Sequence, residues 1–167
     1  MCIRDRRKDH RKSLELLQEL QVQPHEAVLE IGAGSGHMAA LLAHHGHHVI
    51  SYEIDQALAD TAAARLSEAG VANVQVRVGD AASLVTQAWP AKSFDVILLS
   101  GSVSEVPPEL LPLLRPGGRL AAIVGDEPMM RTTVVTRMAS GEAVTRQPWD
   151  TVAPRLHGFA QRSRFVF

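Results

Sequence analysis

The amino-acid sequence predicts an α/β fold with a doubly wound, mostly parallel sheet that ends in an antiparallel hairpin. Short apolar segments alternate five times with segments of helical periodicity, as is typical of parallel sheets with right-handed crossovers. Gly32, Gly34 and Gly36 follow the first apolar segment and predict a tight strand-to-helix turn. After residue 124 the alternation stops, and two β-rich segments flank a short polar turn.

The N-terminal part of the chain supplies the first two strands and three helices. Ser13 and Asp55 can each accept a hydrogen bond from a first helical turn, whereas Pro24 and Gly70 follow helices that end. Continuous apolar character indicates strands buried on both faces. The predicted elements are a helix with Leu14, Leu17 and Leu20, a strand at 27–31, a helix through Met38, Leu41 and Leu42, a strand at 49–52, and a helix with Leu58, Ala62, Leu66 and Ala69 facing inward.

The C-terminal part continues this pattern and then changes it. Pro107 and Pro108 fit the first turn of a helix, and Pro116 with two glycines predicts a turn into the fifth strand. The predicted elements are a strand at 74–78, a helix near 81–88, a strand at 94–99, a helix at 109–114, a strand at 120–124, hairpin strands at 132–138 and 143–149, and a last strand at 164–167.

The length of 167 residues suits one domain, which we expect at residues 13–167. Residues 1–12 are dense in charge and lack periodicity, so we expect a disordered or non-native tail there. Residues 1–6 resemble translated library adaptor, which suggests that the chain is an N-terminally shortened copy of a longer protein.

The composition excludes several classes of protein. Hydrophobic residues make up 46%, charged residues 21%, and the formal net charge is -1, so neither disorder nor a strong nucleic-acid field is indicated. No segment resembles a signal peptide or an apolar span of ~20 residues, and Cys2 is the single cysteine. We therefore expect a monomeric cytoplasmic protein that binds neither membrane nor nucleic acid.

The glycine loop and three acids predict a ligand site at the carboxyl edge of the sheet. Glu30, Glu53 and Asp80 stand at the ends of three successive strands, and doubly wound sheets bind ligands at this edge. One candidate is a dinucleotide, because residues 34–39 fit G-x-G-x-x-G/A and Glu53 lies 19 residues after Gly34. Against it, only about forty residues follow the fifth strand, which is short for a dehydrogenase substrate region. A carboxylate at Glu30 would also repel a diphosphate and attract a cation.

The stretch Glu30-Ile31-Gly32-Ala33-Gly34-Ser35-Gly36 resembles the first motif of class I methyltransferases, which bind S-adenosylmethionine. The resemblance implies a seven-stranded, Rossmann-like methyltransferase fold in which Glu30 faces the cationic methionine end of the cofactor. It also implies that Glu53 accepts hydrogen bonds from the ribose and Asp80 one from the adenine. The implied cofactor-binding residues are Glu30, Gly32, Ala33, Gly34, Gly36, Glu53, Ile54, Asp80, Ala81 and Ser100.

Three further segments resemble the bacterial protein-L-isoaspartate O-methyltransferase family: FDVILLSG at 94–101, EVPPEL at 105–110 and LRPGGRL at 114–120. The likeness runs from about Leu14 to Phe167, and the Glu-Val-Pro turn is its most specific part. It implies methyl transfer to a carboxylate of isoaspartyl residues in damaged proteins, a repair reaction that requires no general base because carboxylates are ionised at neutral pH. The acceptor-binding candidates are Ser102, Val103 and Pro107, and no catalytic residue is assigned.

Other functions stay open. The family has an N-terminal segment whose hydroxyl-bearing motif faces the acceptor, and here one helix and the charged tail take its place. A non-catalytic or truncated S-adenosylmethionine-binding domain is therefore an alternative, as is a methyltransferase for RNA or a small molecule. We expect no metal site, because neighbouring residues at a helix end point in different directions; the residues concerned are His44, His45, His47 and His48.

Overall fold

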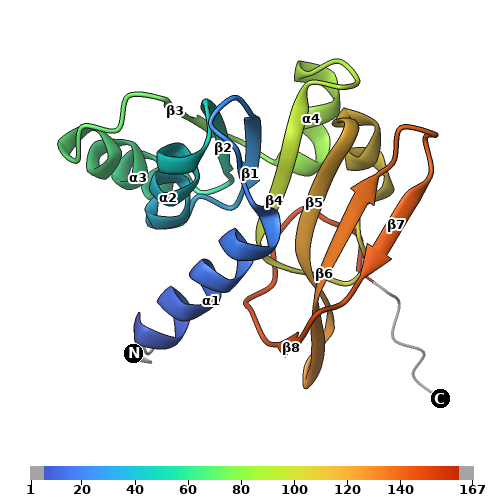
Figure 1. Cartoon of the computed structure of the whole chain (residues 1–167). Coiled ribbons are helices and arrows are strands. Elements are labelled where there is room, and N and C mark those ends of the chain that lie inside the picture. The colour runs from blue at the N-terminus through green and yellow to red at the C-terminus, as the bar shows by residue number, and fades with distance from the viewer. Residues whose placement is uncertain (1–5, 162–167) are drawn as a thin grey trace.

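The computed structural model describes residues 6–161, which form one sheet with helices packed on both faces (Figure 1). The alternation of strands and helices up to the fifth strand is the predicted one. In chain order the elements are α1 (Arg6–Leu20), β1 (Ala27–Ile31), α2 (His37–His45), β2 (His48–Glu53), α3 (Gln56–Glu68), β3 (Val74–Val78), α4 (Ala81–Ala88), β4 (Phe94–Val103), the 3-10 helix η1 (Pro108–Leu113), β5 (Leu114–Asp126), β6 (Met129–Arg137), β7 (Ala143–Arg146) and β8 (Asp150–Thr151).

The sheet has the strand order β3-β2-β1-β4-β5-β6-β7, and β8 pairs with β6. The first five strands pair in parallel, while β6 and β7 add antiparallel neighbours at one end. The chain order reverses between β1 and β4, and such a reversal leaves a crevice at the carboxyl ends of the strands. The predicted doubly wound, mostly parallel sheet with an antiparallel C-terminal hairpin is confirmed.

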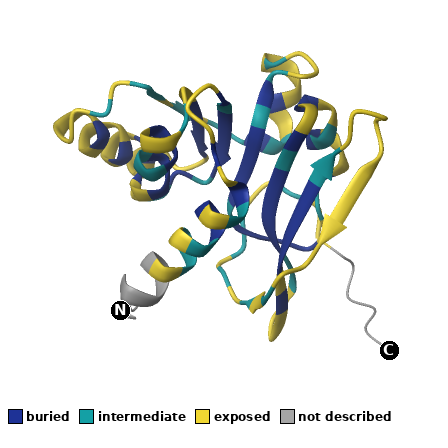
Figure 2. Ribbon diagram, viewed as in Figure 1, coloured by how far each residue is buried: buried dark blue, intermediate teal, exposed yellow. Residues whose placement is uncertain are grey.

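The core consists of two layers of apolar side chains, one on each face of the sheet. Successive residues of a strand point to opposite faces. Val28 of β1 therefore packs with Leu20 of α1 and Leu42 of α2, whereas Leu29 packs on the other face with Val85 of α4. Figure 2 shows that burial is nearly continuous along the central strands and ends at β7, which is exposed along its length. Helices on both faces thus hold the central strands, whose ends carry the site, in a rigid frame.

The first helix is longer than predicted. α1 begins at Arg6, so residues 6–12 are helical and the expected disordered tail is wrong for this stretch. Arginine and lysine have good helix propensity, and they extend a helix without adding the apolar stripe by which a helix is recognised. Residues 1–5 lie outside the part of the chain that the structure describes.

The buried sides of α1 and α3 differ from the predicted ones by one or two positions. Leu14 is 43% exposed and Leu16 is buried instead, because two residues span about 200° around a helix. Leu58 is 47% exposed, and Ala59 takes its place beside the sheet. Ala69, also expected inside, is an exposed C-cap residue. Small alanines fill the narrow space under α3, so the larger leucine lies outside.

Strands β4 and β5 are much longer than predicted. β4 extends to Val103 and β5 begins at Leu114, because the two strands remain paired at both ends, from Phe94 with Leu114 to Val103 with Val124. The helix expected at 109–114 is the short 3-10 helix η1, and it contains Pro112, which has no amide hydrogen to donate within a longer α-helix. The last strand expected at 164–167 lies outside the described residues.

A buried ion pair fastens the end of α1 to β5. The Arg119 guanidinium donates to both carboxylate oxygens of Glu26, at 2.5 and 2.8 Å, and to the carbonyl oxygens of Leu20 and Gln21 at 2.6 and 2.9 Å. Burial acts to raise the pKa of Glu26, but the hydrogen bonds from Arg119 and from the Gln23 amide, with the nearby positive charge, leave this pKa below its ordinary value. The pair therefore fixes where α1 leaves the sheet.

Candidate cofactor site

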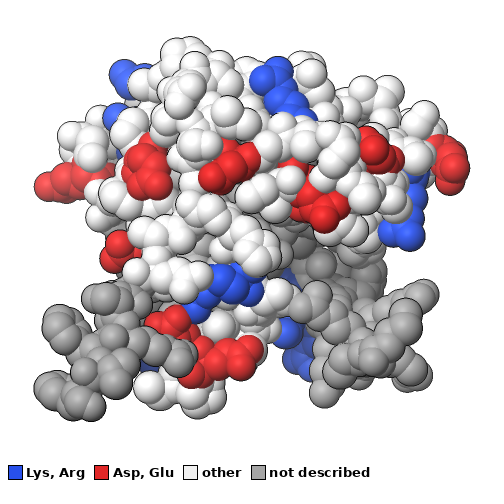
Figure 3. All heavy atoms as spheres, turned by 180° about the vertical axis from the view of Figure 1, so that it is seen from behind, with Lys and Arg blue, Asp and Glu red and all other residues white. Residues whose placement is uncertain are grey.

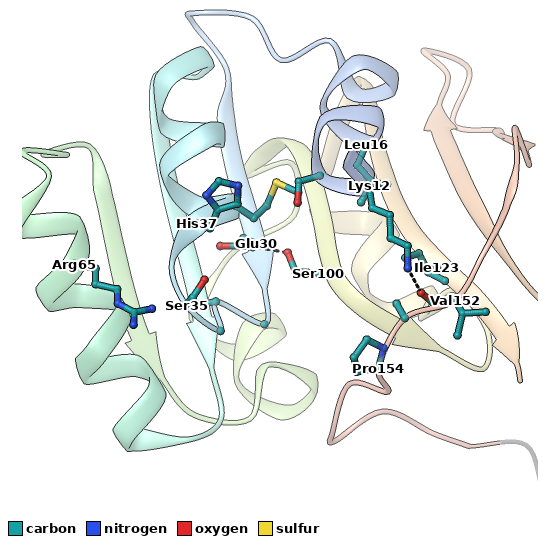
Figure 4. A pocket seen from close by; sticks show the side chains of 16 residues that line it. Lys12, Leu16, Glu30, Ser35, His37, Arg65, Ser100, Ile123, Val152 and Pro154 are labelled. Carbon is teal, nitrogen blue, oxygen red and sulfur yellow. Dashed lines mark hydrogen bonds between the residues drawn. The ribbon is translucent and has the colours of Figure 1, made fainter. Parts of the chain in front are cut away.

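A cleft of about 1010 Å³ opens at the carboxyl ends of β1, β4 and β5 (Figure 4). Glu30 and Ser100 belong to its floor, and the glycine loop at 32–35 forms one rim. Lys12 and its neighbours on α1 form a wall that faces the segment 152–154. The cleft lies where the strand order reverses, the place at which doubly wound sheets bind their ligands.

The glycine loop turns sharply and is held by backbone hydrogen bonds. The amides of Gly32 and Ala33 donate to the carbonyl oxygen of Tyr52 at 2.8 and 3.1 Å, and the Gly36 amide donates to Ala33 at 2.8 Å. Gly36 has a φ of 82°, and a Cβ added there would lie 3.3 Å from the backbone oxygen of Ala62. Glycine at this position therefore allows both the left-handed turn and the close approach of α2 to α3.

Replacing Gly36 with Ala is expected to lower the free energy of unfolding by about 2 kcal/mol. A positive φ strains any residue that has a Cβ, and this Cβ would also lie too close to Ala62 of α3. Gly34→Ala is the matched control, because Gly34 also has a positive φ, of 51°, but no atom within 4 Å of an added Cβ. That variant should lose only about 1 kcal/mol. Urea unfolding measures both, and equal losses would contradict the role given to the contact with Ala62.

Glu30 is the central acid of the site. Glu30 lies at the floor of the cleft, and its side chain has no exposure to solvent. The hydroxyl of Ser51 donates to one carboxylate oxygen at 2.6 Å, and the hydroxyl of Ser100 donates to the other at 2.8 Å. Both oxygens are thus fixed by neighbouring strands, and the carboxylate has a single orientation.

The surroundings of Glu30 make its negative charge costly. Burial raises its pKa to about 7, and the negative charge of Glu53 adds to the rise, while the hydrogen bonds from Ser51 and Ser100 oppose it. A cation that entered the cleft would stabilise the ionised form. The site is therefore suited to a positively charged ligand.

Glu53, at the end of β2, supports the glycine loop directly. One of its carboxylate oxygens accepts a hydrogen bond from the Gly34 amide at 2.8 Å, and the other accepts one from the Asp55 amide at 3.1 Å. Its side chain is buried and does not line the cleft itself. A carboxylate can accept about four hydrogen bonds, so the two amides leave some of its lone pairs unused.

The other predicted cofactor residues lie outside the cleft lining. Asp80 caps α4 by accepting from the Ala82 amide at 3.0 Å, and its carboxylate lies against Gly158. Ala81 is buried in the core beneath α4, and Ile54 is 45% exposed. The cleft lining includes five predicted residues: Glu30, Gly32, Ala33, Gly34 and Ser100.

The acceptor-binding candidates are not brought into the cleft. Ser102, Val103 and Pro107 are all buried. The reason is that β4 continues past its predicted end and pairs there with a C-terminal segment: the Ser102 amide donates to Pro154 at 2.7 Å, and the Leu156 amide donates back to Ser102 at 2.9 Å. The part of β4 expected to face an acceptor is therefore covered by the chain itself.

Several residues of the cleft were not predicted. Lys12 donates from Nζ to the carbonyl oxygen of Val152 at 2.6 Å, which joins α1 to the segment 152–154 across one side of the cleft. Nothing local in the sequence indicates this contact, which spans 140 residues. Ser51 does not line the cleft but holds Glu30 from below, and it could have been found from the sequence. A serine inside an apolar strand, two residues before Glu53, lies on the same face of the sheet as Glu53.

A second, more open pocket of about 640 Å³ lies between α1 and β8, and its lining residues are Arg11, Lys12, Glu15, Trp149, Asp150 and Thr151. The four histidines at the end of α2 are exposed, and the described residues contain no group of three side chains placed to hold a metal ion. Figure 3 shows acidic and basic groups scattered over one face without a continuous basic patch. No helix among residues 6–161 is both long and apolar enough to cross a membrane.

Solved structures share this architecture. A protein-L-isoaspartate O-methyltransferase superposes with a TM-score of 0.76 at 23% identity, covering 88% of this chain and 47% of that chain. A SAM-dependent methyltransferase from Thiobacillus denitrificans, in complex with S-adenosyl-L-homocysteine, has a TM-score of 0.56 at 27% identity, covering 67% of this chain and 47% of that one. Strand order, glycine loop and cleft together define a Rossmann-like methyltransferase fold.

The chain belongs to the protein-L-isoaspartate(D-aspartate) O-methyltransferase family, whose model matches residues 8–152. Protein-L-isoaspartate O-methyltransferase 1 of Nitrosospira multiformis is 39% identical over 130 residues, which are 77% of this chain and 53% of the relative. Protein-L-isoaspartate O-methyltransferase 2 of Rhodopseudomonas palustris is 38% identical over 148 residues, 87% of this chain and 66% of the relative. The chain thus spans about half to two thirds of the length of these relatives.

Proposed function

We propose that the cleft binds S-adenosylmethionine and that the chain takes part in methyl transfer to isoaspartyl carboxylates of damaged proteins. The observation that carries the proposal is Glu30, a buried acid fixed by two hydroxyls directly under a cleft beside a bare glycine loop. A relative of known structure carries S-adenosyl-L-homocysteine, the demethylated form of this cofactor. Repair of cytoplasmic proteins by a monomer belongs to the same proposal.

The residues of the cleft fit this cofactor. Glu30 would face the ammonium and sulfonium groups, which a carboxylate attracts. The glycine loop offers backbone without side chains, so the nucleoside can lie close to it. Glu53 would accept from the ribose hydroxyls with the lone pairs that the Gly34 and Asp55 amides leave open. Asp80 stays the predicted partner of the adenine amino group.

For this reaction the protein needs mainly to position the two reactants and to exclude water from them. Bound S-adenosylmethionine supplies a methyl group on a positively charged sulfur, and an acceptor carboxylate is already ionised at neutral pH, so no general base is needed. α1 and the segment 152–154 would exclude water above the floor. Lys12, on that wall, is a cation that would attract an anionic acceptor.

A second candidate is cofactor binding without turnover. The chain spans about half the length of some relatives, and the acceptor candidates on β4 are buried. In this case the cleft would take the cofactor, while the acceptor would need parts of the relatives that this chain does not match. A methyltransferase for RNA has less support, because the viewed face has no continuous basic patch.

Calorimetric titration with S-adenosylmethionine, followed by a methyl-release assay on an isoaspartyl peptide, tests both candidates. We expect saturable binding, and a loss of about tenfold or more in affinity when Glu53→Gln and Asp80→Asn are combined, since two hydrogen bonds to charged acceptors become weaker, neutral ones. Glu142→Gln, in the exposed turn between β6 and β7, is the control. Turnover supports the first candidate and binding alone the second. Absence of binding by the native chain contradicts both.

A further inference from the structure

We propose that Ser51 is a positioning residue for the cofactor site: its hydroxyl keeps the Glu30 carboxylate ionised and turned toward the cleft. The inference rests on the proposed function and adds to it a residue that does not line the cleft. Ser51 is wholly buried in β2, with apolar neighbours on either side along the strand. A hydroxyl in such a place requires a partner, and that partner is Glu30.

The register of the sheet sets this contact. β1 and β2 are parallel, and Glu30 lies directly opposite Ser51, so both side chains leave the same face. The distance from the Ser51 hydroxyl to the carboxylate oxygen is 2.6 Å, typical of a charge-assisted hydrogen bond. A hydroxyl has one proton to give, and Ser51 gives it to the oxygen that Ser100 does not reach. Ser51 is therefore matched to an ionised Glu30.

The hydrogen bond from Ser51 is important for keeping Glu30 ionised, because other influences on Glu30 raise its pKa. Burial is the largest influence on the pKa of Glu30, and Ser51 gives the strongest of the opposing hydrogen bonds. Glu53, on the same strand as Ser51, raises this pKa further. The other charged or titratable groups that border the cleft are Lys12 on α1, His37 on α2 and Arg65 on α3. Without Ser51, Glu30 would hold its proton to a higher pH.

The test is the pH dependence of S-adenosylmethionine affinity in Ser51→Ala, measured by calorimetry between pH 5.5 and 9. If the cofactor binds the ionised acid, native affinity falls as the pH drops through about 7. In Ser51→Ala the midpoint should rise by about one pH unit. The variant should then bind about fivefold more weakly at pH 7 and equally well at pH 9. A merely structural role would weaken binding equally at every pH.

Two more variants keep the test decisive. Ser51→Cys fills the same space with a weak donor, so it should shift the midpoint like Ser51→Ala and replaces it if that variant fails to fold. Thr132→Val is the control, because Thr132 is buried on β6 and its hydroxyl has no hydrogen-bond partner among the described residues. An unchanged midpoint in Ser51→Cys overturns the inference while leaving the proposed function intact. Absence of cofactor binding by the native chain would instead contradict the proposed function.

Discussion

Replacing Glu30 with Gln is expected to weaken S-adenosylmethionine binding by about 30-fold while making the folded chain more stable at alkaline pH. The loss follows from removing a charge-assisted contact worth about 2 kcal/mol to the cofactor cation. The gain follows from burial, because the folded chain raises the pKa of Glu30 from 4.5 to about 7. The two effects have opposite signs, so a damaged fold cannot mimic them.

The sign of the stability effect follows from the protons bound in each state. Between pH 4.5 and about 7 the folded chain holds a proton on Glu30 that the unfolded chain has released. The contribution of Glu30 to the free energy of unfolding therefore falls as the pH rises. The total fall is about 3 kcal/mol. Glu30→Gln should remove it and be more stable than the native chain at pH 8, but not at pH 4.5. Urea unfolding at the two pH values measures this.

The exposed acid Glu109 on η1 provides the matched control for this experiment. Glu109→Gln makes the same chemical change outside the cleft, so cofactor affinity and the pH profile of unfolding should both stay native. Full affinity in Glu30→Gln would show that the buried carboxylate does not face the cofactor. Equal stability of Glu30→Gln and the native chain at both pH values would contradict the cost assigned to its charge.

Replacing Arg119 with Ala should lower the free energy of unfolding by about 3–5 kcal/mol at pH 7. The guanidinium fills the space between α1 and β5. Its loss leaves the buried Glu26 carboxylate and two carbonyl oxygens without their hydrogen-bond donor. Side-chain exposure is 15% for Arg119 and 10% for Glu26, so water can replace little of the lost bonding. Urea unfolding at pH 7 provides the measurement.

The pH dependence separates this effect from a simple loss of packing. In the native chain the lowered pKa of Glu26 gives stability that is present above about pH 4.5 and lost as the pH falls. In Arg119→Ala the unpaired acid should gain from protonation, so the difference between variant and native chain should narrow at pH 3.5. Arg115→Ala breaks a more exposed pair with Asp95 and should lose less than about 1 kcal/mol. If the difference in free energy of unfolding between Arg119→Ala and the native chain were the same at pH 7 and pH 3.5, the destabilisation would be due to lost packing alone.

Local patterns in the sequence were enough to predict the parallel part of the sheet. A continuous apolar run marks β1 as a buried strand, and apolar residues at helical spacing mark α2 as a helix. The missed turns of α1 have charged residues and no apolar stripe, so their helical state depends on backbone propensity. The longer ends of β4 and β5 arise from pairing with each other, which no local pattern contains.

The same distinction applies to the candidate site. Glu30 and the glycine loop are contiguous in sequence, and they meet at the floor and rim of the cleft. Lys12 and Pro154 line the cleft because of long-range packing, which no local pattern in the sequence indicates. Ser102, predicted to contact the acceptor, is buried because the segment 154–156 pairs with the end of β4. Long-range contacts thus explain both why Lys12 and Pro154 line the cleft and why Ser102 does not.

The hydrogen bond between Lys12 and Val152 joins two parts of the chain that are remote in sequence at one side of the cleft. A molecule that fills the cleft must touch α1 and the segment 152–154 together. Its occupancy is then thermodynamically linked to the docking of both. Ligand addition should slow amide hydrogen exchange and proteolytic cutting in these two segments in parallel, and loosening of either one should hasten ligand release.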